Sequence, residues 1–237
     1  MCGRVAVDYD EIIAGAQNTA LTDWVTGPPQ GASSSFNVAP TQHIPVAFVD
    51  HADGSPRYET AFWSLLPPWS KELKPKFPTF NARAESAHEK PTFKIPLESM
   101  RCAVTVSSFY EWTGPKSART PHAIFGPEPL LPLAGLFSWW HGRATPGAPE
   151  SWHLTCTILT QESAGIMTAL HDRMPVFLDD ALTRSWLDPQ LPGTAVLGDV
   201  LAASRDYSAT LSEHAVAPLR GDGPALLAPT NPPTLDV

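Results

Sequence analysis

The second residue of the chain is a cysteine, Cys2, within the opening sequence MCGRVAV. Chain ends usually fray, so a thiol at this position is either an incidental part of a first strand or is kept there for chemistry. Initiator methionine is removed when the next side chain is small, which predicts a mature chain that begins with Cys2. Its thiol and α-amine, with ordinary pKa values of about 8.5 and about 7.7–8.0, would both be partly nucleophilic at neutral pH.

An N-terminal aminothiol of this kind is suited to reaction with aldehydes. The amine forms a Schiff base, and the thiol then closes a five-membered thiazolidine ring. The thiol could instead attack a carbonyl by itself, as in cysteine hydrolases and N-terminal-nucleophile hydrolases. A metal-ligand role is disfavoured because the chain contains no CxxC pair. Position alone leaves the incidental and the chemical interpretations of Cys2 equally open.

Three further side chains are candidates to work with a nucleophile. Glu111 lies among aromatic residues in SFYEWT, where apolar surroundings suit a carboxyl group to proton transfer; the alternative is a surface glutamate. His171, in TALHDRMP, is either a proton carrier or a cap at the C-terminal end of a predicted helix. Asn81, which opens NARAE, is either a helix N-cap or an amide that orients the nucleophile.

Basic residues flank these candidates. Arginines stand next to or near them in the motifs, at Arg4, Arg83, Arg101 and Arg173, and a Pro-rich loop combines Trp69 with Lys71, Lys74 and Lys76. Cations beside an exposed aromatic ring suit single-stranded nucleic acid, through phosphate contacts and base stacking. The alternative for the loop is ordinary solvation. Cys102 and Cys156 lie in β-type runs, and we expect them to be inert buried thiols.

The elements that must position these residues are short. The chain has 237 residues and 43% hydrophobic content, enough for a sizeable core, and its 26 prolines and 15 glycines favour short elements joined by turns. Strand-like runs and helices are mixed without a βαβ repeat, which predicts one α+β domain with a curved, barrel-like, largely antiparallel β-core flanked by short helices. The expected domain is 2–221, with a Pro-rich, partly disordered tail at 222–237, and the expected helices cover 8–16, 81–89, 161–170 and 179–187.

Charge and cysteine content exclude several classes of protein. A formal net charge of -8 rules out a basic field over the whole molecule, so nucleic-acid binding would need a local basic patch. An odd count of three cysteines argues against a disulfide framework and indicates a reducing compartment. No signal peptide and no run of about 20 apolar residues is apparent. We therefore expect a cytoplasmic protein without a membrane partner.

Six motifs, in order and spacing, resemble the SRAP family, the SOS response-associated peptidases. They are MCGR at the start, FNVAPTQ at 36–42, FNARAES at 80–86, RCAVTVSSFYEW at 101–112, AGLF at 134–137 and TCTILTQESAGIMTALHDRMPVFL at 155–178. Together they extend the resemblance over about residues 2–228, nearly the whole chain. The resemblance implies a single α+β domain around a barrel-like β-core.

The resemblance also implies a chemistry. Family members recognise abasic sites in single-stranded DNA and capture the aldehyde of the ring-opened sugar as a thiazolidine. By motif, Cys2 would be the nucleophile, and its helpers would be Asn81 at the amine or sugar, Glu111 as the proton carrier and His171 in sugar-ring opening. DNA contacts would come from phosphate-binding arginines, base-packing residues and a cleft residue: Arg4, Arg83, Arg173, Pro40, Trp69 and Thr160. No cofactor or metal is implied, and we expect a monomer that associates with the nucleoid when engaged on DNA.

The sequence departs from the family pattern at a few positions, and two other functions stay open. Ser64 and Ser108 stand where the family has glycine, which raises the question of local turn geometry, and Asp172 stands where it often has asparagine. Beside the crosslinking reaction, with its associated strand-cleaving lyase and autopeptidase activities, the alternatives are a cysteine peptidase of the N-terminal-nucleophile type and a non-catalytic single-stranded DNA-binding module. These functions differ in whether a covalent bond forms, and with what.

Overall fold

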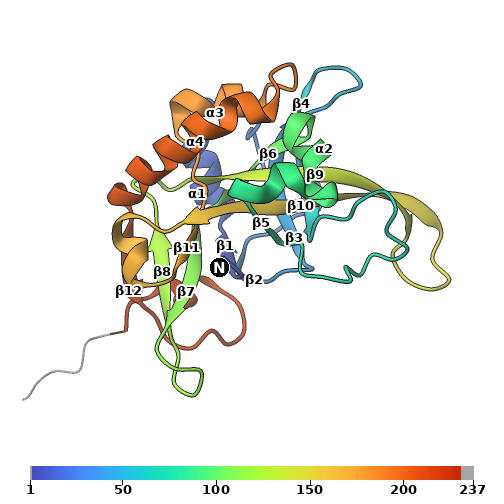
Figure 1. The fold of residues 1–237 in the computed structure, drawn as a ribbon. Coiled ribbons are helices and arrows are strands. Elements are labelled where there is room, and N and C mark those ends of the chain that lie inside the picture. Colours follow the sequence, from blue (N-terminus) through green and yellow to red (C-terminus); the bar gives the residue numbers. More distant parts are fainter. Residues whose placement is uncertain (1, 231–237) are drawn as a thin grey trace, which may run out of the picture.

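A closed β-barrel forms the centre of the computed structural model, which describes residues 2–230 (Figure 1). Five strands pair in a ring, in the order β3 (His43–Val49), β4 (Pro56–Trp63), β10 (Glu150–Glu162), β9 (Leu131–Arg143) and β6 (Arg101–Val106). Within this ring β4 and β10 are parallel, and every other neighbouring pair is antiparallel. The predicted barrel-like, largely antiparallel core is confirmed.

A second, wholly antiparallel sheet lies against the barrel and contains the start of the chain. Its order is β12 (Ser212–Ala215), β8 (Thr120–Phe125), β7 (Ser108–Thr113), β1 (Val5–Val7) and β2 (Ser35–Val38). The first strand therefore has a neighbour on each side: Val5 is opposite Phe109 of β7 and Val38 of β2. Two short strands, β5 (Asn81–Arg83) and β11 (Arg173–Pro175), pair with β10 beyond the ring.

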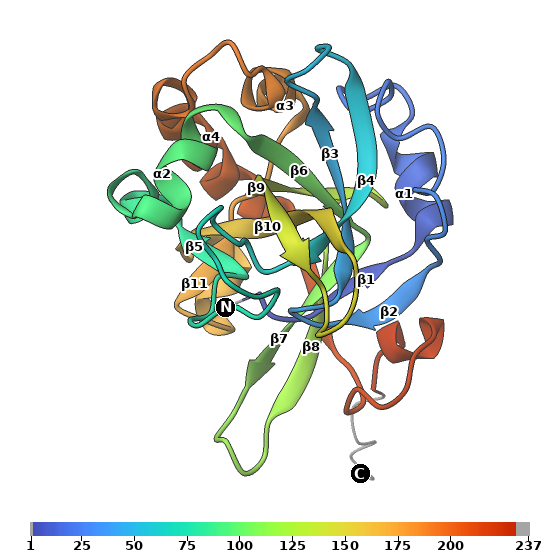
Figure 2. The same ribbon diagram turned by 90° about the vertical axis from the view of Figure 1, so that its right-hand side faces the viewer.

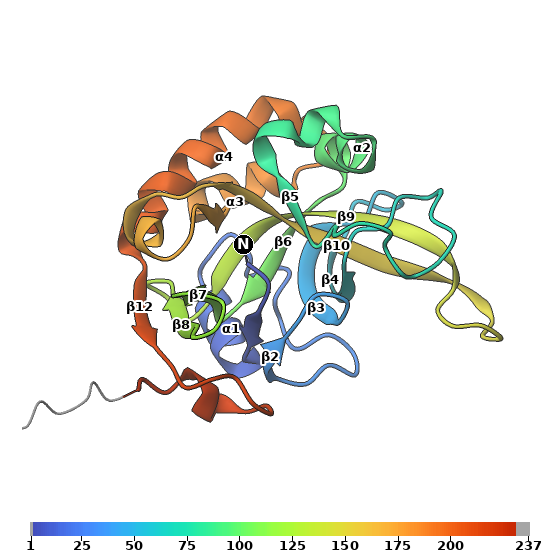
Figure 3. The same cartoon turned by 60° about the horizontal axis from the view of Figure 1, so that its bottom comes forward.

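Short helices cover the sheets. Three of them lie together on one side of the barrel, namely α2 (Pro91–Ser99), α3 (Asp180–Leu187) and α4 (Gly193–Tyr207) (Figures 1 and 3). The expected helices at 8–16 and 179–187 are confirmed as α1 (Tyr9–Ala16) and α3, each capped by the aspartate that precedes it. The Asp179 carboxylate, for example, accepts from the Leu182 N–H at 2.7 Å. No helix in the described part of the chain is both long and apolar enough to span a bilayer.

Two of the predicted helices are wrong. In the stretch 81–89 the first three residues form β5, and only Ala84–Glu89 turns as a 3₁₀ helix, η1. In the stretch 161–170 the first two residues continue β10, and only Gly165–Ala169 is helical, as the 3₁₀ helix η2. The physical reason is the same for both, since pairing with neighbouring strands satisfies the backbone groups that a helix would have satisfied internally.

The last described residues contact the second sheet. The Asp222 side chain accepts from the Phe36 N–H at 2.6 Å, and the Thr230 N–H donates to the Ala215 carbonyl at 2.9 Å. Between them Pro224–Leu227 forms a 3₁₀ helix, η4. The expected tail thus begins with a segment hydrogen-bonded to β2 and β12, whereas 231–237 lie outside the described residues.

Arg101 fastens the helical layer to the barrel. Its side chain is buried at the start of β6, and its guanidinium donates to main-chain carbonyls at the ends of α2 and α3 and in the following loop: Leu97, Glu98, Trp186, Asp188 and Leu191. Carbonyls in the last turn of a helix have no partner within the helix. One side chain thus satisfies groups that would otherwise be buried without hydrogen bonds.

We expect Arg101→Met to lower the free energy of unfolding by about 2–4 kcal/mol, because it leaves several buried carbonyls without donors. Urea unfolding followed by tryptophan fluorescence measures this. Arg184→Met is the control, because among residues 2–230 the Arg184 side chain makes only an exposed 3.7 Å pair with Asp23, and such a change is worth about 0.5 kcal/mol or less. Equal losses in the two variants would contradict the assignment.

Candidate active site around Cys2

Cys2 is fully buried and stands three residues before the first residue of β1. The Tyr110 N–H donates to the Arg4 carbonyl at 2.9 Å, so the ladder between β1 and β7 continues past Val5 towards Cys2. In Figures 1 and 2 the beginning of β1 lies beside β5 and β11. The start of the chain is therefore held inside the fold by main-chain hydrogen bonds, in a place where chain ends usually fray.

Asn81 connects β5 to this position. Its Nδ2 donates to the Cys2 carbonyl at 2.7 Å, while its Oδ1 is buried and has no hydrogen-bond partner among the described residues. The helix-cap interpretation of Asn81 is wrong, because the residue opens a strand. The amide instead fixes the Cys2 backbone and leaves a buried acceptor beside it, which matches what an orienting residue would need.

Glu111 acts on the Cys2 thiol through its charge. It lies on β7 with only 3% of its surface exposed, so the surface-glutamate interpretation is wrong. Burial, and secondarily the negative charge of Glu111, raise the pKa of the Cys2 thiol far above its ordinary value. The thiol is therefore protonated at neutral pH, and the thiolate that reacts through sulfur is scarce.

His171 stands on a turn between η2 and β11. Its Nδ1 accepts from the Arg173 backbone N–H at 2.9 Å and lies 2.6 Å from an Asp172 carboxylate oxygen, while Ser163 Oγ donates to its carbonyl. Among the described residues no hydrogen bond engages its Nε2, and none links it to Cys2 or Asn81. The structure thus links Asn81 and Glu111 to Cys2, and it fixes His171 through contacts with its own neighbours.

The β10 strand pairs with the two short strands that carry Arg83 and Arg173. Thr160 lies opposite Arg83 of β5 on one side and Pro175 of β11 on the other. Thr160, expected to line a cleft, is fully buried, and its carbonyl accepts from Arg173 Nη2 at 2.6 Å. Arg83 is exposed. Thr160 therefore holds Arg173 in place through its carbonyl. Of these three residues, Arg83 and Arg173 have the guanidinium groups that suit a phosphate.

Two of the three expected phosphate-binding arginines already have protein partners. Arg173 makes a two-point ion pair with Glu85, both at 2.8 Å. Arg4 Nη1 donates to Asn37 Oδ1 at 3.0 Å. The sequence analysis missed Glu85 and Asn37 although both stand in the quoted motifs. These contacts join residues 88 and 33 positions apart, and no local pattern marks such distant pairs.

Trp69 and Pro40 lie in loops away from the strand ladder. Trp69 is 61% exposed, in the loop at 67–78, and the loop encloses a hollow of about 710 Å³ that Lys71, Lys74 and Phe77 help to line. Pro40 is half-buried in the turn after β2. An exposed indole beside lysines is suited to base stacking, as the sequence indicated.

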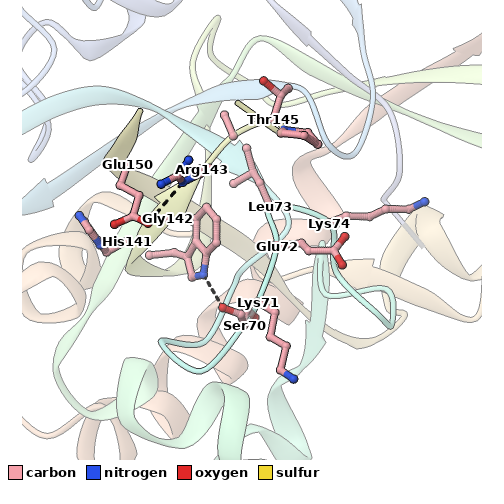
Figure 4. Close-up of a pocket in the computed structure, with 13 residues that line it drawn as sticks. Ser70, Lys71, Glu72, Leu73, Lys74, His141, Gly142, Arg143, Thr145 and Glu150 are labelled. Carbon is pink, nitrogen blue, oxygen red and sulfur yellow. Dashed lines mark hydrogen bonds and ion pairs between the residues drawn. The ribbon is translucent and has the colours of Figure 1, made fainter. Parts of the chain in front are cut away.

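A second hollow of about 510 Å³ lies between the same loop and the β9–β10 arm (Figure 4). The Trp140 indole N–H donates to the Ser70 carbonyl at 2.9 Å across it, and Arg143 pairs with Glu150 at its edge. None of Cys2, Asn81, Glu111 or His171 lines this hollow. It therefore belongs to the loop surface and is separate from the cluster around the cysteine.

The departures from the family pattern leave the backbone unstrained. Ser64 and Ser108 are both buried, and among the described non-glycine residues only Asn18 and Thr41 have positive φ. The serines therefore adopt conformations open to any residue, and the turn geometry needs no glycine there. No group of three or more His, Cys, Asp or Glu side chains within 2–230 is placed to hold a metal ion.

The whole chain was compared with known proteins. Residues 1–219 match the family described as SOS response associated peptidase (SRAP). The chain belongs to this family. It is similar to the abasic site processing proteins YoaM and YoqW of Bacillus subtilis (strain 168), with 39% identity over 195 residues and 36% over 196, covering 80% of this chain in each case and 80% and 81% of the relatives. A solved phage-related protein from Bordetella bronchiseptica superposes with a TM-score of 0.67 at 26% identity, covering 91% of this chain and 94% of that one.

The environment of Cys2 predicts slow thiol chemistry in the folded protein. At pH 7.5 we expect iodoacetamide to alkylate Cys2 at least 10-fold more slowly in the native chain than in urea, since each unit of raised pKa removes about a factor of ten in thiolate. Glu111→Gln removes one of the two causes and should accelerate alkylation of Cys2. Peptide mass spectrometry measures both rates.

Cys102 is the internal control for this experiment. Its thiol is buried and Glu111 is not among the causes that raise its pKa, so Glu111→Gln should leave its rate unchanged. Native and unfolded chains that alkylate Cys2 equally fast would show that the thiol is not held as described.

Proposed function

We propose that the protein processes abasic sites in single-stranded DNA by forming a covalent thiazolidine crosslink through Cys2. The observation that carries the proposal is the convergence on this residue: the Asn81 amide bonds its carbonyl, and the Glu111 charge acts on its thiol. The relatives YoqW and YoaM, named for abasic site processing, support the choice of substrate. The peptidase activity in the family description would then use the same nucleophile, Cys2.

The reaction would proceed in two additions. After removal of Met1, the Cys2 α-amine attacks the C1′ aldehyde of the ring-opened sugar, and loss of one water gives the Schiff base. The Cys2 sulfur then adds to the imine carbon, its proton passes to the imine nitrogen, and the five-membered ring is complete. Aldehyde and aminothiol thus combine with release of water only, and no cofactor takes part.

Each neighbouring side chain would assist one step of the crosslinking reaction. Glu111 takes the proton that the buried, protonated thiol must lose and returns it on reversal, because the raised pKa of Cys2 makes unaided loss slow. The unpartnered Oδ1 of Asn81 accepts a hydrogen bond from the α-amine. His171, through Nε2, serves the opening of the sugar ring. The same Schiff base would also permit strand cleavage by β-elimination.

Binding of the DNA itself would rest on a few local contacts. Arg4 directly precedes β1, Arg83 lies on β5 and Arg173 lies on β11. Trp69 offers an exposed ring for stacking, and Pro40, in the turn after β2, would pack against a base. The net charge of -8 opposes DNA binding by the molecule as a whole. We therefore expect modest affinity for intact DNA, with selectivity supplied by the covalent step.

The direct test is a denaturing gel of the purified protein with a single-stranded oligonucleotide that carries one abasic site. We expect a heat-stable, slowly migrating band that disappears with Cys2→Ala and with intact DNA of the same sequence. Intact-mass spectrometry of the same sample should show that Met1 has been removed. Noncovalent binding that survives Cys2→Ala, with no band in the wild type, would favour a DNA-binding module instead, and cleavage of peptides without any band would favour a peptidase.

Loss of the proton acceptor should slow the reaction without abolishing binding. We expect Glu111→Gln to reduce the rate of crosslink formation about 10²-fold or more, the usual contribution of a positioned acid–base group. A time course on the same gel measures the rate, and fluorescence anisotropy with intact single-stranded DNA checks that affinity is unchanged. A crosslinking rate equal to that of the wild type would remove Glu111 from the mechanism.

A further inference from the structure

The Arg173 guanidinium is occupied by a carboxylate of the protein itself. Nη1 and Nη2 each lie 2.8 Å from one oxygen of Glu85, and Nη2 also donates to the Thr160 carbonyl at 2.6 Å. The arginine side chain is 14% exposed, whereas that of Glu85 is 46% exposed. The pair therefore lies at the surface, with the arginine beneath and the carboxylate on the solvent side.

The geometry of this pair is the one that a phosphate would need. A guanidinium binds a carboxylate or a phosphate through the same two parallel N–H groups, and it cannot offer them to both at once. The remaining nitrogen, Nε, is buried and has no partner among the described residues. A DNA phosphate therefore reaches the paired N–H groups of Arg173 only when Glu85 leaves.

We propose that Glu85 is a built-in competitor for the DNA phosphate at Arg173, displaced each time the strand binds. The proposal rests on the DNA-binding function proposed above and adds a residue that sets its affinity. Competition of this kind lowers affinity for intact strands, so that lasting attachment depends on the covalent step at an abasic site.

The carboxylate is both charged and free to leave. Partial burial opposes its ionisation, but the hydrogen bonds and charge of Arg173, with a 3.3 Å bond from the Glu162 backbone N–H, lower the pKa of Glu85. Glu85 is therefore ionised at neutral pH, and its exposed side chain can turn into water, where a carboxylate is well solvated. Arg173 would stay in place, because the Thr160 carbonyl and the β10–β11 ladder still hold it.

The test measures binding of intact single-stranded DNA over a range of salt concentrations by fluorescence anisotropy. In the wild type the phosphate replaces one anion by another, so Arg173 contributes no net counterion release. Glu85→Gln leaves the arginine unneutralised, and we expect about 3- to 10-fold tighter binding at low salt. The slope of log K against log salt should steepen by about 0.7, the value for one additional phosphate contact on a single strand.

Two controls separate competition from a general change of charge. Asp23→Asn makes the same change in net charge at an exposed pair with Arg184, and it should leave both the affinity and the slope unchanged. Combining Glu85→Gln with Arg173→Gln should abolish the gain, because the gain acts through that arginine. Glu85→Ala serves as a second neutral variant, and thermal unfolding verifies that each variant is folded.

The outcomes are distinct. Tighter binding with a steeper slope in Glu85→Gln supports the proposal. Weaker binding, parallel to that of Arg173→Gln, would mean that Glu85 merely positions the arginine and would overturn it, as would unchanged binding. A wild type that crosslinks abasic DNA while Glu85→Gln shows no gain would overturn only the role of Glu85, whereas a wild type that binds no single-stranded DNA would overturn both proposals.

Discussion

The pairing of β1 between β2 and β7 is the constraint on which the rest of the site depends. Val5 has a strand partner on each side, and the ladder continues through the Arg4 carbonyl. A strand that is central in a sheet has no freedom to fray, so the residues before it inherit a fixed position. This is how a residue at the second position, Cys2, becomes fully buried.

The strands that pair with β10 of the barrel contribute the other residues of the candidate site. Strand β10 is long enough to close the ring with β9 and β4 and still to pair with β5 and β11. Pairing with β5 aims the Asn81 amide at Cys2, and pairing with β11 brings Arg173 beside Thr160. Cys2 and its neighbours therefore come from different sheets, and the candidate site exists only where the two sheets meet. The pairing that stabilises the barrel therefore also sets the geometry of the candidate site.

Burial and charged or polar neighbours limit the availability of the Cys2 thiol and of two arginines. Burial and the charge of Glu111 make the Cys2 thiol resist ionisation, and Arg4 and Arg173 are engaged by Asn37 and Glu85. Neither the Cys2 thiol nor these cations are fully available in the folded protein. This arrangement would suit the proposed reaction with an aldehyde, because a permanently exposed thiolate would be open to oxidation and alkylation.

The sequence by itself determined local features of the fold and the candidates for the site. Asp8 and Asp179 marked two helix starts because a capping aspartate acts within three residues of itself, and the ordered motifs pointed to Cys2, Asn81 and Glu111. Only the tertiary structure decided what depends on distant partners. Residues 81–83 form a strand, although their local pattern predicts a helix, because they pair with β10. Arg173 pairs with Glu85, which lies 88 positions away in the chain. Strand pairing and ion pairs of this kind form only when the fold brings remote segments together, so a local sequence pattern does not predict them.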